Sequence, residues 1–335
     1  MLCFLASLPF LAMTLVASAN GLPQAGTRLA TQADNAATST ASAWQYSVLD
    51  GYFHQSRGSN GNDSSHDYLD ESFGLIDTSR GRWTNLRDSL TRLNEETNNG
   101  TLFKVLFLGR HGQGWHNVAE DHYGSEEWNR YWSKVNTDGN MTWGPDAQLT
   151  PLGKEQANRV HRTWKKEALA DAPVPTARYS SPLSRAASTC EITYSNLTSQ
   201  RPIFVEELRE TIGVHTCDKR HSKTWLSEHY PDFVFAEPFD EKDVLWHADE
   251  RETDKHQDLR SRQALDRIFS QDNSTFVSLT AHGGTIASIL RIVQHPPVRT
   301  QTGSITPVVV KAVRRVDQRR TPLGAMNLAQ RVFGP

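Results

Sequence analysis

The sequence predicts an α/β fold, because two apolar runs end in glycine-containing segments and a third segment resembles a strand end followed by a helix. Residues 102–108 are apolar and stop at Gly109. Residues 275–281 repeat this pattern and are followed by a helix-like stretch at residues 285–290. Residues 179–189 resemble a third strand end, followed by the start of another predicted helix. Open α/β sheets bind ligands beyond the carboxyl ends of their strands, so we expect these three ends to share one site.

Two further segments predict helices that flank the sheet. Residues 83–93 place three leucines at helical spacing. Residues 150–157 begin with Thr150 as an N-cap and Pro151 in the first turn, which is typical of a helix start. We expect this second segment to be the first helix of a doubly wound core.

The residues at the three strand ends are suited to binding an anion. Arg110 offers a planar fork of donors that fits phosphate, and His111 beside it can attack phosphorus while its imidazole is neutral. His282 ends the second run, and Arg185 stands near the start of the helix after the third. Glycines such as Gly112 let backbone N–H groups approach a bound anion. An anion pocket is the simplest common purpose of these residues.

Five ordered blocks of the chain resemble the histidine phosphatase superfamily, which has the phosphoglycerate-mutase-like fold. The blocks are Arg110-His111-Gly112, Asn117, Ser181-Pro182-Leu183-Ser184-Arg185-Ala186, Leu208-Arg209-Glu210 with Gly213, and His282-Gly283. Residues 106–120 and 146–153 resemble the fungal phosphomutase-like subgroup. The resemblance covers the chain from about Trp44 onward. It implies a three-layer αβα sandwich with a mostly parallel central sheet.

The resemblance implies a role for each matching side chain. His111 would be the nucleophile that accepts the phosphoryl group. Arg110, Arg185 and His282 would bind the phosphoryl oxygens and stabilise the charge of the transition state. Asn117 would add a neutral donor. Neighbouring guanidinium charges also disfavour protonation of His111, which keeps its lone pair available.

The proton donor must be a separate group, and the resemblance implies that it is Glu210. Its carboxyl group would protonate the leaving oxygen and later activate water. Glu206 and Glu207 lie close in sequence, and only the match of residues 208–210 selects Glu210 among the three. Gly112 and Gly283 would add backbone contacts to the substrate.

The chain departs from the phosphoglycerate mutase pattern after the nucleophile. A glycine, Gly114, stands where those enzymes have a serine, so one hydroxyl contact is missing. The missing contact favours a phosphatase over a sugar-phosphate mutase. His116 and His215 lie near the predicted site, and we interpret both as surface or supporting histidines rather than catalytic ones.

We therefore expect a metal-independent, cofactor-independent phosphomonoesterase with a phosphohistidine intermediate on His111. A mutase that returns the phosphoryl group to a bound product is the first alternative. A second is a repurposed site that acts on or binds a carboxylated metabolite. The sequence contains no P-loop, HExxH helix, CxxC pair or GxSxG elbow, which argues against other catalytic classes.

Length and charge fit one catalytic domain that acts on a small phosphorylated molecule. The chain has 335 residues and a net charge of -2, which argues against a nucleic-acid-binding surface. We expect the domain to span residues 44–335, with an aromatic-rich N-terminal extension up to residue 99 and insertions such as residues 216–255. These insertions would form the pocket walls, so the physiological substrate stays open, as does the oligomeric state.

The N-terminus predicts entry into the secretory pathway. Residues 1–19 are mostly apolar and end in an Ala-x-Ala cleavage pattern, which is typical of a signal peptide. Residues 20–43 lack apolar periodicity and are interpreted as a flexible leader. We expect a secreted protein without a stable membrane partner. Five asparagines satisfy the N-glycosylation pattern, namely Asn62, Asn99, Asn140, Asn196 and Asn273.

Two cysteines, Cys190 and Cys217, remain after removal of the predicted signal peptide. In an oxidising compartment they could form a disulfide that joins the helix after Arg185 to the segment after Glu210. Two buried free thiols are the alternative, because sequence alone does not show whether the two residues lie within bridging distance.

Overall fold

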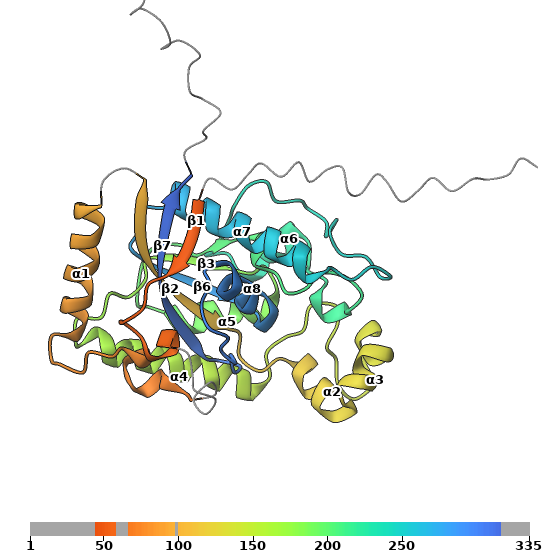
Figure 1. The fold of residues 1–335 in the computed structure, drawn as a ribbon. Coiled ribbons are helices and arrows are strands. Elements are labelled where there is room, and N and C mark those ends of the chain that lie inside the picture. Colours follow the sequence, from red (N-terminus) through yellow and green to blue (C-terminus); the bar gives the residue numbers. More distant parts are fainter. Residues whose placement is uncertain (1–43, 58–65, 98–99, 316–335) are drawn as a thin grey trace, which may run out of the picture. The chain divides into compact units, whose positions relative to one another are not determined.

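The computed structural model describes residues 44–57, 66–97 and 100–315 (Figure 1). The predicted signal peptide at residues 1–19 and leader at residues 20–43 lie outside these ranges, as do Asn62 and Asn99. The described part contains one seven-stranded sheet. Its strands are β1 (Trp44–Val48), β2 (Thr101–Arg110), β3 (Ala177–Ser180), β4 (Ile203–Phe204), β5 (Val234–Phe235), β6 (Phe276–Ala281) and β7 (Ile305–Arg314).

The sheet is mostly parallel, as predicted. Its strand order is β1-β7-β2-β6-β3-β4-β5. β2, β6, β3, β4 and β5 pair in parallel along one continuous run, and β7 pairs antiparallel with β2 and β1. The carboxyl ends of β2, β6 and β3 therefore meet at the same edge of the sheet.

Helices cover both faces of the sheet (Figure 1). They are α1 (Arg82–Glu96), α2 (Trp115–Tyr123), α3 (Ser125–Arg130), α4 (Pro151–Ala168), α5 (Ser184–Tyr194), α6 (Lys223–His229), α7 (Asp254–Gln271) and α8 (Gly283–Ile292). Short 3₁₀ turns lie at His54–Arg57, Tyr68–Asp70, Ser72–Gly74, Trp132–Lys134, Glu206–Leu208 and Thr216–Asp218. None of the helices in the described residues is long and apolar enough to cross a membrane.

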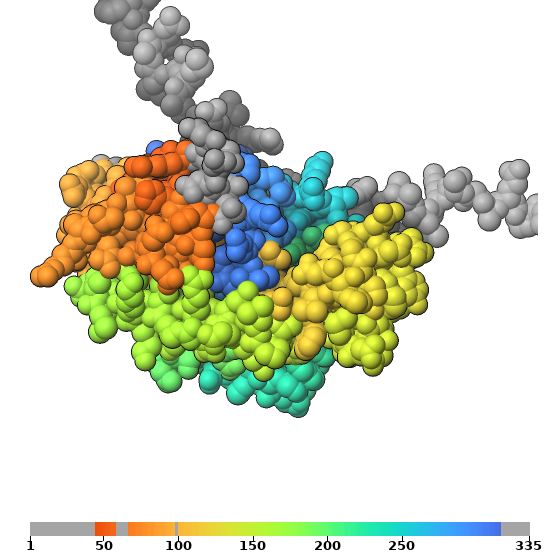
Figure 2. Space-filling model, turned by 90° about the horizontal axis from the view of Figure 1, so that it is seen from below, coloured from red at the N-terminus to blue at the C-terminus, as the bar shows by residue number. Residues whose placement is uncertain are grey.

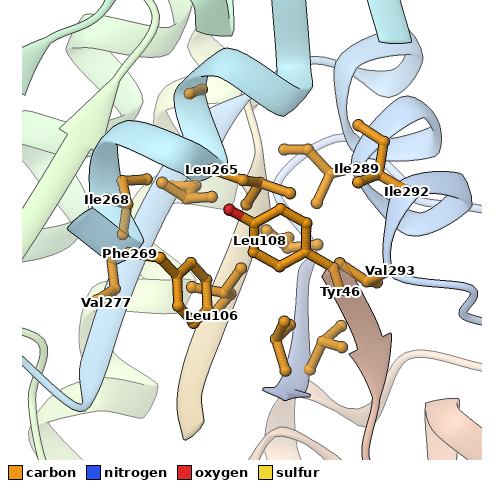
Figure 3. Packing of buried hydrophobic residues seen from close by; sticks show 14 of the residues in the cluster. Tyr46, Leu106, Leu108, Leu265, Ile268, Phe269, Val277, Ile289, Ile292 and Val293 are labelled. Atoms are coloured by element: carbon orange, nitrogen blue, oxygen red, sulfur yellow. The ribbon is translucent and has the colours of Figure 1, made fainter. Parts of the chain in front are cut away.

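Two hydrophobic clusters hold the three layers together. Alternate side chains of β2 point to opposite faces, so Leu106 and Leu108 enter one cluster while Val105 and Phe107 enter the other. The first cluster joins the sheet to α7 and α8, as Figure 3 shows for Leu265 and its neighbours. The second joins it to α1, α4 and α5. The three-layer αβα sandwich is thus confirmed.

The predicted strand and helices are found, but the prediction that residues 150–157 begin the first helix of the core is wrong, because α1 precedes α4 and packs in the same cluster. Residues 102–108 lie within β2, where residues 103–109 are all buried. Residues 83–93 lie within α1, which buries Leu86 and Leu90. Thr150 caps α4, since its side chain accepts a hydrogen bond from the Gly153 backbone N–H.

A small aromatic cluster lies apart from the two main ones. It comes from α2, α3 and the residues after them, and its buried members are Ala119, Trp128, Trp143, Ala147 and Cys217. Figure 2 shows α2 and α3 in yellow at one end of the visible face. This segment follows shortly after β2, which ends at Arg110 just before His111, so it forms one side of the predicted site.

Candidate active site

The structure brings the three predicted strand ends together. Arg110 pairs with Ala281 in the register of β2 and β6, so the two residues that follow, His111 and His282, lie side by side. Their ring centroids are 5.0 Å apart. Ser181 follows β3 at the same edge, and its hydroxyl oxygen lies 2.8 Å from His282 Nε2.

The His111 ring is fixed with one nitrogen available for attack. Its Nδ1 lies 2.7 Å from the carbonyl oxygen of Gly112. A carbonyl can only accept, so Nδ1 carries the proton and Nε2 keeps its lone pair. The side chain is buried, with 1 % of the residue exposed.

The surroundings keep His111 neutral. Burial and the nearby charges of Arg185 and Arg110 hold the pKa of His111 well below its usual range. A neutral imidazole is the nucleophilic form, so the ring is prepared for attack at neutral and mildly acidic pH.

Arg185 projects from the first turn of α5 and is held by the segment after Glu210. Its Nη1 donates to the Cys217 carbonyl at 2.7 Å, and its Nη2 donates to Asp218 Oδ1 at 2.8 Å. Burial opposes ionisation of Asp218, but the charges of Arg185 and Arg251 outweigh it and lower the pKa of that carboxyl. The pair fixes the direction of the guanidinium, and Arg185 Nε is left buried without a hydrogen bond in the described part of the chain.

The start of α5 is itself anchored by a buried carboxylate. Asp146 accepts hydrogen bonds from the backbone N–H and the hydroxyl of Ser184, at 2.8 and 2.7 Å. Burial raises the pKa of Asp146 to about 7 despite these donors. Asp146 therefore positions the turn from which Arg185 extends.

Arg110 ends β2 and lies against the start of α8. Its Nη1 donates to the Thr300 carbonyl at 2.8 Å. A β-carbon at Gly283 would lie 3.6 Å from Arg110 Nε, so the guanidinium runs along the glycine backbone. Arg110 Nε is buried and has no hydrogen bond among the residues described.

His282 adds a further donor beside the nucleophile. The Ser181 hydroxyl accepts from the Leu183 N–H at 3.3 Å, and it can also donate its own proton to His282 Nε2 at 2.8 Å. When Ser181 donates in this way, the imidazole proton sits on Nδ1, which is buried without a partner in the described ranges. Burial and the charge of Arg185 hold the pKa of His282 well below its usual range, so the ring is a neutral donor.

The carboxylate of Glu210 reaches the same edge of the sheet. Its Oε2 accepts a hydrogen bond of 3.1 Å from the Gly284 N–H in the first turn of α8. Its Oε1 accepts from the Thr211 N–H at 3.0 Å and from Gln257 Nε2 at 3.3 Å. A β-carbon at Gly284 would lie 2.3 Å from Glu210 Oε1, so only glycine permits this approach.

The neighbouring glutamates point elsewhere. Glu206 pairs with Arg209 and Arg220, and Glu207 pairs with Arg267. Of the three candidates, Glu210 alone contacts α8 beside His282. Glu210 is therefore the glutamate whose carboxylate lies at this edge of the sheet, and its role as acid and base stays a prediction.

Asn117 and Gly112 shape the turn after the nucleophile. Asn117 Oδ1 accepts from the Gly114 N–H at 3.0 Å, so the side chain caps α2 while its amide nitrogen stays available. The Gly112 N–H donates to the Thr189 hydroxyl at 3.0 Å, which joins this turn to α5. The Gly112 N–H is thus paired within the protein, and the contacts of both residues to substrate stay predictions.

The sequence did not reveal the residue that holds the Glu210 segment. Arg260 of α7 is buried and donates to the carbonyls of Glu207, Arg209 and Glu210, at 2.8, 2.9 and 3.2 Å. Its charge is balanced by Glu252 at 2.7 Å. No local pattern marks Arg260, because its partners lie about fifty residues earlier in the chain.

The suggested disulfide is not found. Cys190 and Cys217 are both free and buried in the structure. Cys190 packs into the cluster between the sheet and α5, whereas Cys217 belongs to the small aromatic cluster. Burial raises the pKa of Cys190 to about 11, which leaves it an unreactive thiol.

One group among the described residues has the spacing of metal ligands, namely His215, Cys217 and Asp218. Both oxygens of Asp218 already face guanidinium groups, those of Arg185 and Arg251. Two fixed positive charges at the same carboxylate disfavour a cation there. Burial and Arg251 also lower the pKa of His215 to about 4.

The topology and this pocket define a class: an α/β protein with paired histidines and arginines at the carboxyl ends of its parallel strands. Residues 106–322 match the model of the histidine phosphatase superfamily (branch 1). The chain belongs to this superfamily. Its activity is therefore phosphoryl transfer in the broad sense that covers phosphatases and mutases.

Relatives in fungi agree with this assignment. A probable phosphoglycerate mutase of Arthroderma benhamiae is 40% identical over 294 residues, which cover 83% of this chain and 87% of that protein. A probable phosphoglycerate mutase of Saccharomyces cerevisiae is 36% identical over 306 residues, which cover 82% and 98%. The resemblance to the fungal phosphomutase-like subgroup is thus confirmed.

Solved structures show more distant similarity. A putative alpha-ribazole-5'-P phosphatase of Escherichia coli has 18% sequence identity and a TM-score of 0.40, over 64% of this chain and 95% of that one.

Proposed function

We propose that this protein is a secreted phosphomonoesterase that works through a phosphohistidine on His111. One observation carries the proposal. Around the fixed lone pair of His111, three nitrogen atoms of Arg110, Arg185 and His282 are buried without hydrogen-bond partners in the described chain. An unpaired buried donor costs about 1–3 kcal/mol, and the oxygens of a bound phosphoryl group would pair with such donors.

In the first step, His111 Nε2 attacks phosphorus, the N–P bond forms and the P–O bond to the alcohol breaks. The carboxylic acid of Glu210 gives its proton to the departing oxygen. Arg110, Arg185 and His282 bind the phosphoryl oxygens, where negative charge develops in the transition state. Covalent catalysis divides one difficult displacement into two easier ones.

In the second step, water attacks the phosphorus of the phosphohistidine. The Glu210 carboxylate accepts a proton from this water, the O–P bond forms and the N–P bond breaks. Inorganic phosphate leaves, His111 regains its lone pair and Glu210 regains its proton. No step needs a metal or an organic cofactor, so we propose that the enzyme is metal-independent.

A mutase is the second candidate, because the fungal relatives carry that name. A mutase would return the phosphoryl group to a bound product before water reacts. Gly114, which lacks the serine hydroxyl of the phosphoglycerate mutase pattern, favours hydrolysis instead. No observation on the described residues favours the repurposed carboxylate site.

Secretion is a separate part of the proposal. Three predicted glycosylation sites fall on described residues, and Asn140, Asn196 and Asn273 are all exposed. Exposed loop asparagines are accessible to the glycosylation machinery. We expect the protein in the medium of a fungal expression host, with an electrophoretic mobility that shifts after enzymatic deglycosylation.

The deciding experiment is phosphate release from an aryl phosphate between acid and neutral pH, in the presence of a chelator. Wild type is compared with His111→Ala. We expect chelator-resistant activity that falls by at least about a thousandfold in the variant, since loss of a covalent nucleophile removes most of the rate. A folded wild type that releases no phosphate would redirect the assignment to the mutase, which a two-substrate transfer assay then tests.

A further inference from the structure

A third histidine lies at the pocket, in addition to His111 and His282. His116 stands in the first turn of α2, and its ring centroid is 5.3 Å from that of His111. The His111 ring is in turn 5.0 Å from that of His282. The nucleophile thus lies beside two other imidazoles, although the sequence suggested only a surface or supporting role for His116.

The position of His116 is tied to the glycine at residue 114. A β-carbon at Gly114 would lie 2.6 Å from His116 Nδ1 and 2.8 Å from its Cε1. The imidazole therefore fills the space that a side chain at residue 114 would need. The phosphoglycerate mutase pattern has a serine at this position, so in this chain the His116 ring stands where a serine side chain would begin.

The His116 ring has one buried nitrogen atom, Nδ1, that makes no hydrogen bond within the described part of the chain. Burial and the charges of Arg185 and Arg110 hold the pKa of His116 well below its usual range. The ring is therefore neutral and offers one N–H donor.

We propose that His116 is a substrate-contacting residue whose imidazole N–H donates a hydrogen bond to an oxygen of the phosphoryl group transferred to His111. The inference rests on the proposed function. It assigns to His116 the phosphoryl contact that a serine hydroxyl at residue 114 would make in the phosphoglycerate mutase pattern. A neutral donor suits this position. It binds phosphate without adding a third positive charge beside a nucleophile that must keep its lone pair.

Packing alone is the competing explanation for His116. If the ring only fills space, its shape matters and its N–H does not. Two substitutions separate these roles: His116→Phe keeps a flat ring without a donor, and His116→Gln keeps an N–H donor without a ring. His122→Phe makes the same change on an exposed position of α2 and is the matched control.

The experiment measures kcat/KM for an aryl phosphate, the competitive inhibition constant of inorganic phosphate and the thermal unfolding temperature of each variant. We expect His116→Phe to lower kcat/KM about 100-fold, the usual effect of removing one transition-state donor. We expect its affinity for phosphate to fall about tenfold or more. His116→Gln should recover most of both, and His122→Phe should match wild type.

Two results would overturn the proposal. One is a His116→Phe variant with the activity and phosphate affinity of wild type. The other is an equal loss in the Phe and Gln variants, which would assign the effect to ring packing. If wild type itself has no phosphatase activity, the proposed function fails. Calorimetric titration of wild type and His116→Phe with inorganic phosphate then still decides the contact, and equal affinities contradict it.

Discussion

The protonation state of the pocket depends on single residues. Three imidazoles lie together there, and Arg110 and Arg185 favour the neutral form of each. Asp218 balances Arg185, so the guanidinium keeps its charge and direction inside the protein. The result is a pocket that is cationic through its arginines while its histidines stay neutral. The neutral His111 therefore keeps a lone pair for attack, and the charged Arg110 and Arg185 remain available to bind an anion.

The lowered pKa of His111 predicts how activity depends on pH. As pH falls through 6.5, an ordinary histidine gains a proton and loses its lone pair, whereas His111 keeps it. We expect the acidic limb of kcat/KM to lie well below pH 6.5. The measurement is a pH–rate profile between pH 3.5 and 8, corrected for the second ionisation of the substrate near pH 6. A limb at pH 6.5 or above would contradict the assignment of His111 as a neutral nucleophile.

Among the elements, the loop after β2 and the start of α4 approach one another very closely. A β-carbon at Gly112 would lie 2.2 Å from the Gly153 carbonyl oxygen, and one at Gly153 would lie 2.1 Å from that of Gln113. Both obstacles are backbone atoms, which cannot move aside as a side chain does. This contact holds the turn that carries His111 against α4, so the geometry of the nucleophile depends on two glycines.

We expect Gly153→Ala to destabilise the fold by about 1–3 kcal/mol or more and to lower kcat, because the loop must move away from α4. Gly81→Ala is the control, since a β-carbon there meets nothing closer than 3.7 Å. Urea unfolding gives the stability of both variants, and the aryl phosphate assay gives kcat. A Gly153→Ala protein with the stability and kcat of wild type would show that the loop does not need this contact.

The sequence predicts those elements whose signal is local. The strands that end at Arg110 and Ala281 are long apolar runs, and α4 has a cap and a proline at its start. By contrast, β4 and β5 have two residues each, too few to show any period. Asp146, Asp218 and Arg260 were missed, because each acts through a partner more than thirty residues away.

At the scale of the whole molecule, the buried titratable groups make stability depend on pH. Four histidines, namely His111, His116, His215 and His282, have pKa values lowered by burial and by arginine charges. The unfolded chain takes up protons on these residues below pH 6.5 while the folded chain does not, so stability falls as pH falls. Asp146 acts in the opposite direction. Its pKa is raised to about 7, so its contribution is lost as pH rises toward 7.

Because four histidines oppose the single effect of Asp146, we expect the free energy of unfolding to fall below pH 6.5. His215 allows a test of this expectation, since it is not among the residues proposed to contact the substrate. Its pKa is about 4 in the folded chain, and this difference from 6.5 corresponds to about 3 kcal/mol. His215→Gln removes the titrating group, so between pH 7 and pH 4 its free energy of unfolding should fall by about 2–3 kcal/mol less than that of wild type. Urea unfolding at several pH values measures both slopes. Parallel curves of the free energy of unfolding against pH would mean that folding does not lower the pKa of His215. The charge of Arg251 would then not keep that ring neutral.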